Sequence, residues 1–353
     1  MELQKMWEYG DAEKRYNSTI ENEQEAAAQM CTSISYRKHD LYFGRTLDVD
    51  FSFHEQVVIT PRNRMFHLKN GTDYATKYAL IGMGTVMDDV PMYYEAANEK
   101  GLAMAGLNFP KSAVYRKPQK DMDNIAVFEL IPWILGQAET LSQARTLLEK
   151  LNLTDDSFRA DMPTSPLHFM LSDSTGSLVA EPMADGMKLY ENPFDVMTNE
   201  PPFDYHRWNM QKYLNLSPRN EENRFSSRYE LNNYAVGMGA LGLPGDTSSA
   251  SRFVRAAFNL TNSRNEDEEM ENVGQFFHIL DSVSMVQGAT VSNSGKDDIT
   301  LYTCCINATK GIYYYKTRTN NRITAVRLNH EDLDGKELVC FTLNRAQDIC
   351  FDN

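Results

Sequence analysis

The amino-acid sequence predicts an α+β fold in which antiparallel sheets pack against layers of helices. Short strand-like segments occur in pairs joined by tight turns, and amphipathic helices follow in pairs instead of alternating with single strands. The chain has 353 residues, of which 42% are hydrophobic, so it can bury a sizeable core. Because no internal repeat or low-complexity linker interrupts it, we expect a single domain over 31–353, preceded by an N-terminal extension or pro-segment at 1–30.

The predicted strands are short runs of β-branched, aromatic and aliphatic residues that end at turn residues. The first run covers 56–60 and is closed by Pro61. Two later pairs of runs each flank a short polar turn, one at 174–176 and one at 320–321, which indicates two hairpins. The remaining predicted strands are 169–173 with 177–181, 312–317 with 323–328, and 338–343.

The predicted helices combine a capping residue with apolar residues at helical spacing. Thr140 and Gln143 have capping-box spacing, and the leucines and alanine that follow them line one face as far as Leu151. The other predicted helices are a more apolar one at 124–137, one that is capped by Ser248 or Ser249 and continues to Leu260, and one at 272–283.

The composition excludes several classes of protein. The net charge of −14 argues against a nucleic-acid partner and against an anionic membrane surface. The sequence lacks the run of roughly 18 apolar residues that a membrane span needs. Its histidines are scattered without H-E-x-x-H spacing, so no metal site is expected. The five cysteines form no C-x-x-C pair, which favours a reducing, cytoplasmic location over a disulfide framework.

Cys31 is the most informative residue, because its thiol would carry its own base if it became the first residue of the chain. A free α-amine titrates at about 7.7–8.0 and a free thiol at about 8.5, so proton exchange between them is nearly balanced at neutral pH. An activated nucleophile needs a neighbouring base or a lowered pKa. Arg45 and Asp48 follow Cys31 in the same short segment of the chain, so this part of the chain supplies all the necessary groups.

The segment at 1–30 is not a signal peptide, since it carries seven acidic and three basic side chains and no apolar stretch. Two interpretations are open. The segment is either a pro-segment that is removed ahead of Cys31, or it results from a mis-called start, with translation beginning at Met30. We favour the mis-called start, because the motifs described next begin at Met30.

Several short motifs follow one another along the chain. They are Cys31-Thr32, Phe43-Gly44-Arg45-x-x-Asp48, Asn98-Glu99-Lys100-Gly101-Leu102 with Gly106-Leu107-Asn108-Phe109-Pro110, Thr198-Asn199-x-Pro201, and Leu243-Pro244-Gly245-Asp246 with Ser251-Arg252-Phe253. In this order they resemble the choloylglycine hydrolase family, which comprises bile salt hydrolases and penicillin V acylases. The resemblance covers nearly all of 31–345 but not 1–29. It implies a four-layer αββα Ntn-hydrolase sandwich with two antiparallel sheets and a reaction that needs no metal or other cofactor.

The resemblance also implies a role for each matching residue. Cys31 would be the nucleophile, Arg45 would lower the pKa of its thiol, and Asp48 would orient the α-amine or thiol. The backbone N–H of Asn108 and the side-chain amide of Asn199 would stabilise the oxyanion. The α-amine would protonate the departing amine and later activate water against the thioester. The complete implied catalytic set is Cys31, Arg45, Asp48, Asn108, Asn199 and Arg252.

The substrate that the resemblance implies is a conjugated bile salt, in which an amide joins a steroid acid to glycine or taurine. Asn108 favours this substrate over penicillin V, because the penicillin V acylases of the family more often carry Tyr there. Tyr94 is bulkier than expected at its position and would narrow the acyl pocket. The family also implies a homotetramer. The residues aligned with the acyl pocket are Leu47, Tyr94, Phe158, Met162 and Leu167, and large apolar side chains suit a steroid face.

Two alternatives stay open. The first is an acylase of the same mechanism that acts on penicillin V or on an N-acyl homoserine lactone. The second is a binding protein without catalysis, in which Cys31 is never freed from the segment before it. A mature chain whose mass begins at Cys31 would favour the enzymes over the binding protein, and the identity of the released product would separate the two enzymes.

Overall fold

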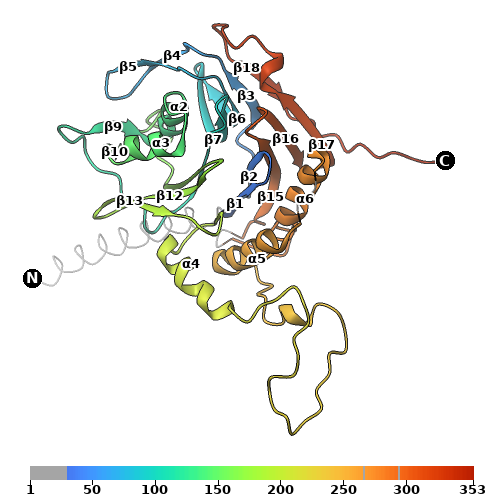
Figure 1. Ribbon diagram of the computed structural model, residues 1–353. Helices are drawn as coiled ribbons and strands as arrows, with labels where there is room; N and C mark the ends of the chain where they lie inside the picture. Colours follow the sequence, from blue (N-terminus) through green and yellow to red (C-terminus); the bar gives the residue numbers. More distant parts are fainter. Residues whose placement is uncertain (1–29, 265–266, 293–294) are drawn as a thin grey trace, which may run out of the picture.

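The computed structural model of the protein describes residues 30–264, 267–292 and 295–353, so the predicted extension at 1–30 lies outside the described residues except for Met30. Two large antiparallel sheets form its centre (Figure 1). The six-stranded sheet contains, in spatial order, β14 (Val196–Met197), β1 (Met30–Arg37), β2 (Leu41–Val49), β15 (Ile299–Asn307), β16 (Ile312–Thr317) and β17 (Asn320–Arg327).

The eight-stranded sheet faces the six-stranded one. It contains, in spatial order, β13 (Gly186–Glu191), β12 (Gly176–Met183), β11 (Leu167–Asp173), β8 (Ala103–Asn108), β7 (Val90–Asn98), β6 (Leu80–Met87), β3 (Gln56–Thr60) and β18 (Val339–Thr342). Two small ribbons accompany it: β4 (Met65–His67) with β5 (Asp73–Ala75), and β9 (Asp123–Ala126) with β10 (Leu151–Thr154). The large sheets meet where β1 and β2 contact β8 and where β16 contacts β6.

Helices cover the outer face of each sheet, which completes four layers. On the eight-stranded sheet, α2 (Leu130–Leu135) packs on β7 and β8, and α3 (Leu141–Leu148) packs on β11 and β12. On the six-stranded sheet, α5 (Ser249–Asn262) and α6 (Glu269–Asp281) pack on β1, β2, β14 and β15. The predicted αββα sandwich is therefore confirmed. The remaining helices are α4 (Phe203–Asn209) and the short 3-10 turns η1 (Val127–Glu129), η2 (Met210–Tyr213), η3 (Met238–Ala240) and η4 (Leu328–His330).

Strand β2 lies at the centre of the six-stranded sheet, and all nine of its residues are buried. Most of them are apolar, but Arg45, Thr46 and Asp48 are polar or charged and need internal hydrogen bonds, because unpaired polar groups are costly to bury. Gly44 is required for the approach of β15, since a Cβ at this position would lie 2.1 Å from the carbonyl oxygen of Cys304. Arg45 and Asp48 therefore lie on a buried strand that pairs with β1 on one side and β15 on the other.

The two predicted hairpins are present. The turn near 174–176 joins β11 to β12, and both of these strands are longer than expected. The turn predicted at 320–321 is wrong by two residues, because β16 ends at Thr317 as predicted and Asn320 already pairs with it as the first residue of β17. The predicted helix at 124–137 is wrong in its first half. Residues 123–126 form β9, and the α-helix begins only at Leu130. Pro132 explains the difference, because proline is tolerated in the first turn of a helix but clashes with the carbonyl four residues earlier in a helix interior.

The predicted helix after Thr140 is also shorter than expected. Thr140 caps α3 by accepting a hydrogen bond from the backbone N–H of Gln143, as the spacing predicted. The helix ends at Leu148, however, and Leu151 belongs to β10, where it pairs with Asp123 of β9. The local apolar periodicity continued past the helix because both elements bury leucines in the same core. The helix capped by Ser248 is confirmed as α5, and the one predicted at 272–283 begins three residues earlier, as α6.

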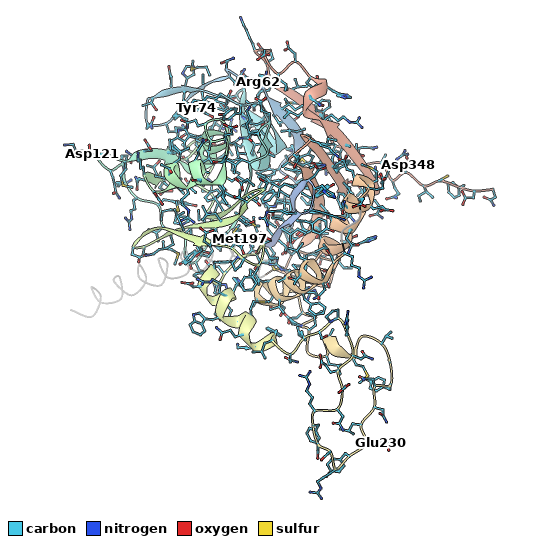
Figure 2. All side chains as sticks on the ribbon, in the orientation of Figure 1. Arg62, Tyr74, Asp121, Met197, Glu230 and Asp348 are labelled. Atoms are coloured by element: carbon cyan, nitrogen blue, oxygen red, sulfur yellow. The ribbon has the colours of Figure 1, made fainter. Side chains whose placement is uncertain are left out.

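A long connection between α4 and α5 leaves the body of the molecule (Figure 1). We call residues 214–247 the arm, and Glu230 lies at its far end (Figure 2). Several large apolar side chains of the arm are largely exposed, among them Leu214, Phe225, Tyr234 and Val236. Among the residues that the structure describes, no helix has both the length and the apolar character that crossing a membrane would require.

Candidate active site

Cys31 is the second residue of β1, and it lies between the two sheets at the base of a cavity. In the antiparallel register of β1 and β2 it stands opposite Leu47. The side chain is only 2% exposed, yet it lines a cavity of about 290 Å³ together with Arg45 and Asn108. This volume is close to the lower end of the range for small-molecule sites, about 300–1,000 Å³.

The Arg45 guanidinium contacts the sulfur directly. Its Nη2 donates to Sγ of Cys31, and its Nη1 donates to the carbonyl oxygen of Gly106 at 2.6 Å. Its Nε donates to the carbonyl of Thr46 at 3.2 Å. Because these contacts reach from β2 to β8, Arg45 joins the two sheets behind the cysteine, and the predicted proximity of Arg45 and Cys31 is present.

Glu95 is a charged neighbour of Arg45 that the sequence motifs did not single out. It lies on β7, it is fully buried, and its Oε2 is 3.8 Å from Nε of Arg45. The hydroxyl groups of Tyr302 and Tyr313 donate to its carboxylate at 2.8 and 2.5 Å. A buried charge needs a partner and hydrogen bonds, and Glu95 has both. Its signal in the sequence was a single acidic residue inside an otherwise apolar strand.

The pKa of the Cys31 thiol is raised, and burial is the main cause. Arg45 acts in the opposite direction, as expected, and Arg252 adds to its effect. The Asp48 carboxylate raises the pKa further. The expectation that Arg45 lowers the thiol pKa is correct for its own contribution, but desolvation outweighs it. The thiol therefore keeps its proton at neutral pH until a base removes it.

Asp48 is held by hydroxyl groups close to the start of β1. Thr46 and Thr300 donate to its two carboxylate oxygens at 2.9 and 2.5 Å. Burial raises the pKa of this carboxyl, while Arg252 and the two hydroxyls oppose the rise. In the sheet register Asp48 stands opposite Met30, one residue before the cysteine. Asp48 therefore lies across the sheet from the Met30–Cys31 peptide bond, and cleavage of this bond would create the α-amine of Cys31.

The side-chain amide of Asn199 is fixed in one orientation. Its Oδ1 accepts two hydrogen bonds, from the backbone N–H of Cys31 at 2.8 Å and from Nη2 of Arg252 at 2.8 Å. Its Nδ2 therefore points the other way and donates to the carbonyl oxygen of Asn108 at 2.9 Å. The two asparagines, which are 91 positions apart, meet beside the cysteine. An amide nitrogen in this place is suited to stabilise a developing oxyanion.

Arg252 binds the backbone around the cysteine. It lies near the start of α5, fully buried, and its Nη1 donates to the carbonyl oxygen of Cys31 at 2.5 Å and to Oγ1 of Thr32 at 2.6 Å. Burial lowers the pKa of this guanidinium, while Asp48 and Cys31 raise it. Arginine stays charged in proteins, so Arg252 supplies a second cation at the cysteine, where it contacts the backbone while Arg45 contacts the sulfur.

The cavity wall contains all five residues that were predicted for the acyl pocket. The hydroxyl of Tyr94 is hydrogen-bonded to Oγ1 of Thr85, which holds the ring in the wall. The sequence missed much of the lining, because these residues come from separate strands, turns and loops that meet only in the fold. The predicted lining residues are Leu47, Tyr94, Phe158, Met162 and Leu167, and those that were missed include Phe53, His54, Met87, Met92, Phe128 and Thr164.

The residues of the implied catalytic set are thus brought together from five parts of the chain. Cys31 and Arg45 come from β1 and β2, Asn108 from the end of β8, Asn199 from the loop after β14, and Arg252 from α5. Among the described residues there is no group of three or more side chains of the types that commonly hold a metal ion. A buried cysteine at the start of a strand in one of the two inner sheets of a four-layer αββα sandwich is the arrangement of the N-terminal nucleophile (Ntn) hydrolase class.

Comparison with known proteins gives the family. The model for linear amide C–N hydrolases of the choloylglycine hydrolase family matches residues 31–341, and the chain belongs to this family. A bile salt hydrolase/transferase of Lactiplantibacillus plantarum is 45% identical over 314 residues, which cover 89% of this chain and 97% of that protein.

Solved structures agree with this assignment. The crystal structure of a variant of the conjugated bile acid hydrolase from Clostridium perfringens is 36% identical, with a TM-score of 0.85, and the match covers 92% of this chain and 100% of the other. The penicillin V acylase from Agrobacterium tumefaciens has a TM-score of 0.73 at 19% identity, over 89% of this chain and 92% of the other. The similarity to the penicillin V acylase shows only that the two proteins share a fold.

Proposed function

We propose that this protein hydrolyses the amide bond of glycine- or taurine-conjugated bile salts, with Cys31 as an N-terminal nucleophile. The observation that carries the proposal is the position of Cys31. This residue lines an apolar cavity, and the Arg45 guanidinium contacts its sulfur. The Asn199 amide lies beside the same residue. The relatives named for bile salt or conjugated bile acid hydrolysis, at 45% and 36% identity, support the choice of substrate.

The first half of the reaction forms a thioester. The free α-amine of mature Cys31 takes the thiol proton, and the sulfur attacks the carbonyl carbon of the substrate amide. The carbonyl electrons move to oxygen, where the side-chain amide of Asn199 and the backbone N–H of Asn108 stabilise the negative charge. When the intermediate collapses, the C–N bond breaks, and the α-ammonium returns its proton to the departing amine of glycine or taurine.

The second half returns the free enzyme. The α-amine takes a proton from water, the hydroxide attacks the thioester carbon, and the same amides stabilise the second oxyanion. Collapse breaks the C–S bond and releases the bile acid, and the α-ammonium returns its proton to the departing sulfur, which restores the thiol and the free amine. The base in both halves is the amine of Cys31. In the chain described here that nitrogen is a peptide N–H, which donates to Asn199 and cannot accept a proton.

The apolar cavity would hold the steroid. Its wall is formed mainly by aliphatic and aromatic side chains, including Ile131, Phe158 and Leu167. Burial of an apolar ligand surface is favourable by about 25 cal/mol per Å², so a rigid hydrocarbon ring system is the natural occupant. The charged glycine or taurine would lie on the other side of the scissile amide, outside this cavity.

The substrate assignment is tested by product analysis with the purified mature protein. Samples receive a glycine-conjugated bile salt, a taurine-conjugated one, penicillin V or an N-acyl homoserine lactone, and the released amine or acid is quantified. We expect glycine or taurine release with a kcat/KM at least about tenfold above that for the other substrates. A higher kcat/KM with penicillin V or the lactone would replace the proposed substrate while keeping the chemistry. No turnover of any of them would favour a binding protein.

Replacement of Arg45 should affect the chemical step more than substrate binding. Arg45 lowers the pKa of the Cys31 thiol, so Arg45→Leu should raise that pKa further, and more alkaline conditions will be needed to remove the proton. We expect kcat to fall on the order of 10²-fold with little change in KM, and the acidic limb of the pH–rate profile to move to higher pH. Kinetics from about pH 6 to about pH 11, which extends above and below the ordinary pKa values of an α-amine and a thiol, measure both.

The matched control for Arg45→Leu is Arg327→Leu, which removes a guanidinium from an exposed position on β17. This control should leave kcat and the pH profile unchanged. If Arg45→Leu behaves like the control, Arg45 has no part in activating the sulfur. Thermal unfolding of both variants is recorded as well, because loss of Arg45 leaves Glu95 as an unpaired buried charge, which destabilises the fold.

We further propose a homotetramer and a cytoplasmic location. The arm exposes several large apolar side chains, among them Leu214, Phe225 and Val236, and covering them in an assembly would remove apolar surface from water. The location is supported by the five cysteines, all of which are free thiols in the structure. Sedimentation of the intact protein should give four chains per particle, and loss of the larger species when Phe225 and Tyr234 are replaced by Ser would assign the contact to the arm.

A further inference from the structure

Two buried histidines hold the backbone on either side of Asn199. Nε2 of His168 lies 2.9 Å from the carbonyl oxygen of Thr198, the residue before Asn199. Nε2 of His206 lies 3.1 Å from the carbonyl oxygen of Asn199 itself. A carbonyl oxygen can only accept, so each ring nitrogen donates. Consecutive carbonyl groups are thus fixed by two side chains that come from different elements, β11 and α4. We call His168 and His206 the histidine clamp.

Both imidazoles are locked in place by their surroundings. The His168 ring stacks on Phe109 with centroids 4.2 Å apart and planes 4° from parallel. The His206 ring stacks on Phe253 of α5 with centroids 4.7 Å apart and planes at 15°. The exposed fractions are 1% and 2%. Since Phe109 directly follows Asn108, the His168 ring also touches the segment that carries the other expected oxyanion donor.

Glu181 connects the two members of the clamp. Its Oε1 lies 3.1 Å from Nδ1 of His168 and accepts from the backbone N–H of Phe203, the first residue of α4, at 2.9 Å. That helix carries His206 three residues later. Glu181 is itself fully buried. A single carboxylate therefore sets the orientation of the His168 ring and the start of the helix that presents His206.

His206 makes its hydrogen bond as a neutral ring. Burial lowers its pKa to about 4, although the Asn199 carbonyl opposes the shift. Its single N–H faces that carbonyl, while Nδ1 has no hydrogen-bond partner within the described part of the chain. Because a neutral imidazole carries one N–H, the donor capacity of the His206 ring is directed at the Asn199 carbonyl.

We propose that His168 and His206 are positioning residues for the amide of Asn199 in the transition state. The proposal rests on the proposed function, in which Asn199 stabilises the oxyanion. The clamp fixes the backbone at Thr198 and Asn199, while Arg252 and the Cys31 N–H fix the amide oxygen. Because the backbone and the amide oxygen of Asn199 are both held, its Nδ2 is in place before the substrate binds. This placement matters because a displacement of a reacting group by about 1 Å can lower the rate by about 10²-fold.

A double-mutant cycle with Asn199 tests the clamp. The variants are His168→Gln, His206→Gln, Asn199→Ala and the two double variants, each assayed for release of glycine from a glycine-conjugated bile salt. We expect each histidine variant to lower kcat by about 10- to 100-fold, with KM changed by less than about threefold. In the Asn199→Ala background the same histidine changes should cost less than about twofold, because the amide that they position is already absent.

Tyr314→Phe is the matched control for a loss of buried hydrogen bonding. Tyr314 is buried on the far side of the six-stranded sheet and donates to Glu269 at 2.9 Å. The Tyr314→Phe variant should have a lower melting temperature than the parent protein and the same kcat. His206→Gln stands as the second test if His168→Gln does not fold, because the two rings reach Asn199 from separate elements.

The outcomes separate the clamp from the proposed function. If the histidine variants lower kcat by the same factor with and without Asn199, or change only KM and stability, the clamp is wrong while the oxyanion role of Asn199 stands. If Asn199→Ala alone leaves kcat within about twofold of the parent protein, the proposed role of Asn199 fails, and the clamp fails with it.

Discussion

Cys31→Ala is expected to abolish amide hydrolysis while the fold persists. Loss of a catalytic nucleophile typically lowers kcat on the order of 10⁶-fold, and the Cys31 sulfur is the group that Arg45 contacts in the cavity. The change removes one sulfur atom and adds no volume, so unfolding free energy should fall by no more than about 1–2 kcal/mol. Glycine release and thermal unfolding of the two purified proteins measure both effects.

Cys31→Ser serves as the more conservative partner. A hydroxyl keeps the size and hydrogen-bonding capacity of the thiol, but it is far less acidic, so the α-amine can deprotonate it only to a small extent. We expect activity well below that of the parent and stability close to it. Near-parental turnover by Cys31→Ala would show that another group attacks the substrate, and the assignment of Cys31 would have to be abandoned.

A chain that keeps Met30 attached to Cys31 should be inactive, although it should fold. Burial raises the pKa of the Cys31 thiol, so the sulfur depends on a base. The nitrogen that would serve is a peptide N–H in such a chain and donates to Asn199. An amide nitrogen is not basic. We therefore expect kcat to fall below about 10⁻³ of the mature value, a loss comparable to removal of a general base.

Two forms of the protein make this comparison. One begins at Met30, which methionine aminopeptidase can remove because cysteine is small, and it should give mature, active enzyme. The other carries Met30→Leu behind a new initiator methionine, which the aminopeptidase should not remove. Melting temperatures within a few degrees of each other would show that the residues ahead of Cys31 affect chemistry and not folding.

The local parts of this fold could be predicted from the sequence. The turn near 174–176 and the capping residues Thr140 and Ser248 act within a few positions, so their patterns indicated β11–β12, α3 and α5. The order of strands could not be predicted in the same way. Strand β2 lies between β1 and β15, whose residues are more than 200 positions apart. Such neighbours are selected by burial of both faces and not by local preference.

In the site, too, the identity of residues within short motifs could be predicted, while features that depend on long-range contacts could not. Cys31, Arg45, Asn108, Asn199 and Arg252 could be named because each stands within a short motif that resembles the family. Their geometry could not, since the Asn199 amide acquires its orientation only when Arg252 and Cys31 approach from other elements.

Glu95 and the histidine clamp were missed for a related reason. Their partners Tyr302, Tyr313 and Thr198 are between 30 and 218 positions away. No spacing rule connects residues that meet only in the folded core. The direction in which the pKa of the Cys31 thiol shifts could not be predicted from the sequence either. It depends on how deeply the sulfur is buried, and the effect of burial outweighs that of Arg45.

The central claim is that a freed Cys31 is both nucleophile and base. The most direct measurement uses samples in which the fraction of chains beginning at Cys31 has been varied and is determined by intact mass. Glycine release from a glycine-conjugated bile salt is then measured on each sample. We predict a rate proportional to the mature fraction, with a line through the origin. Full activity in a sample whose chains all retain residues ahead of Cys31 would contradict the claim.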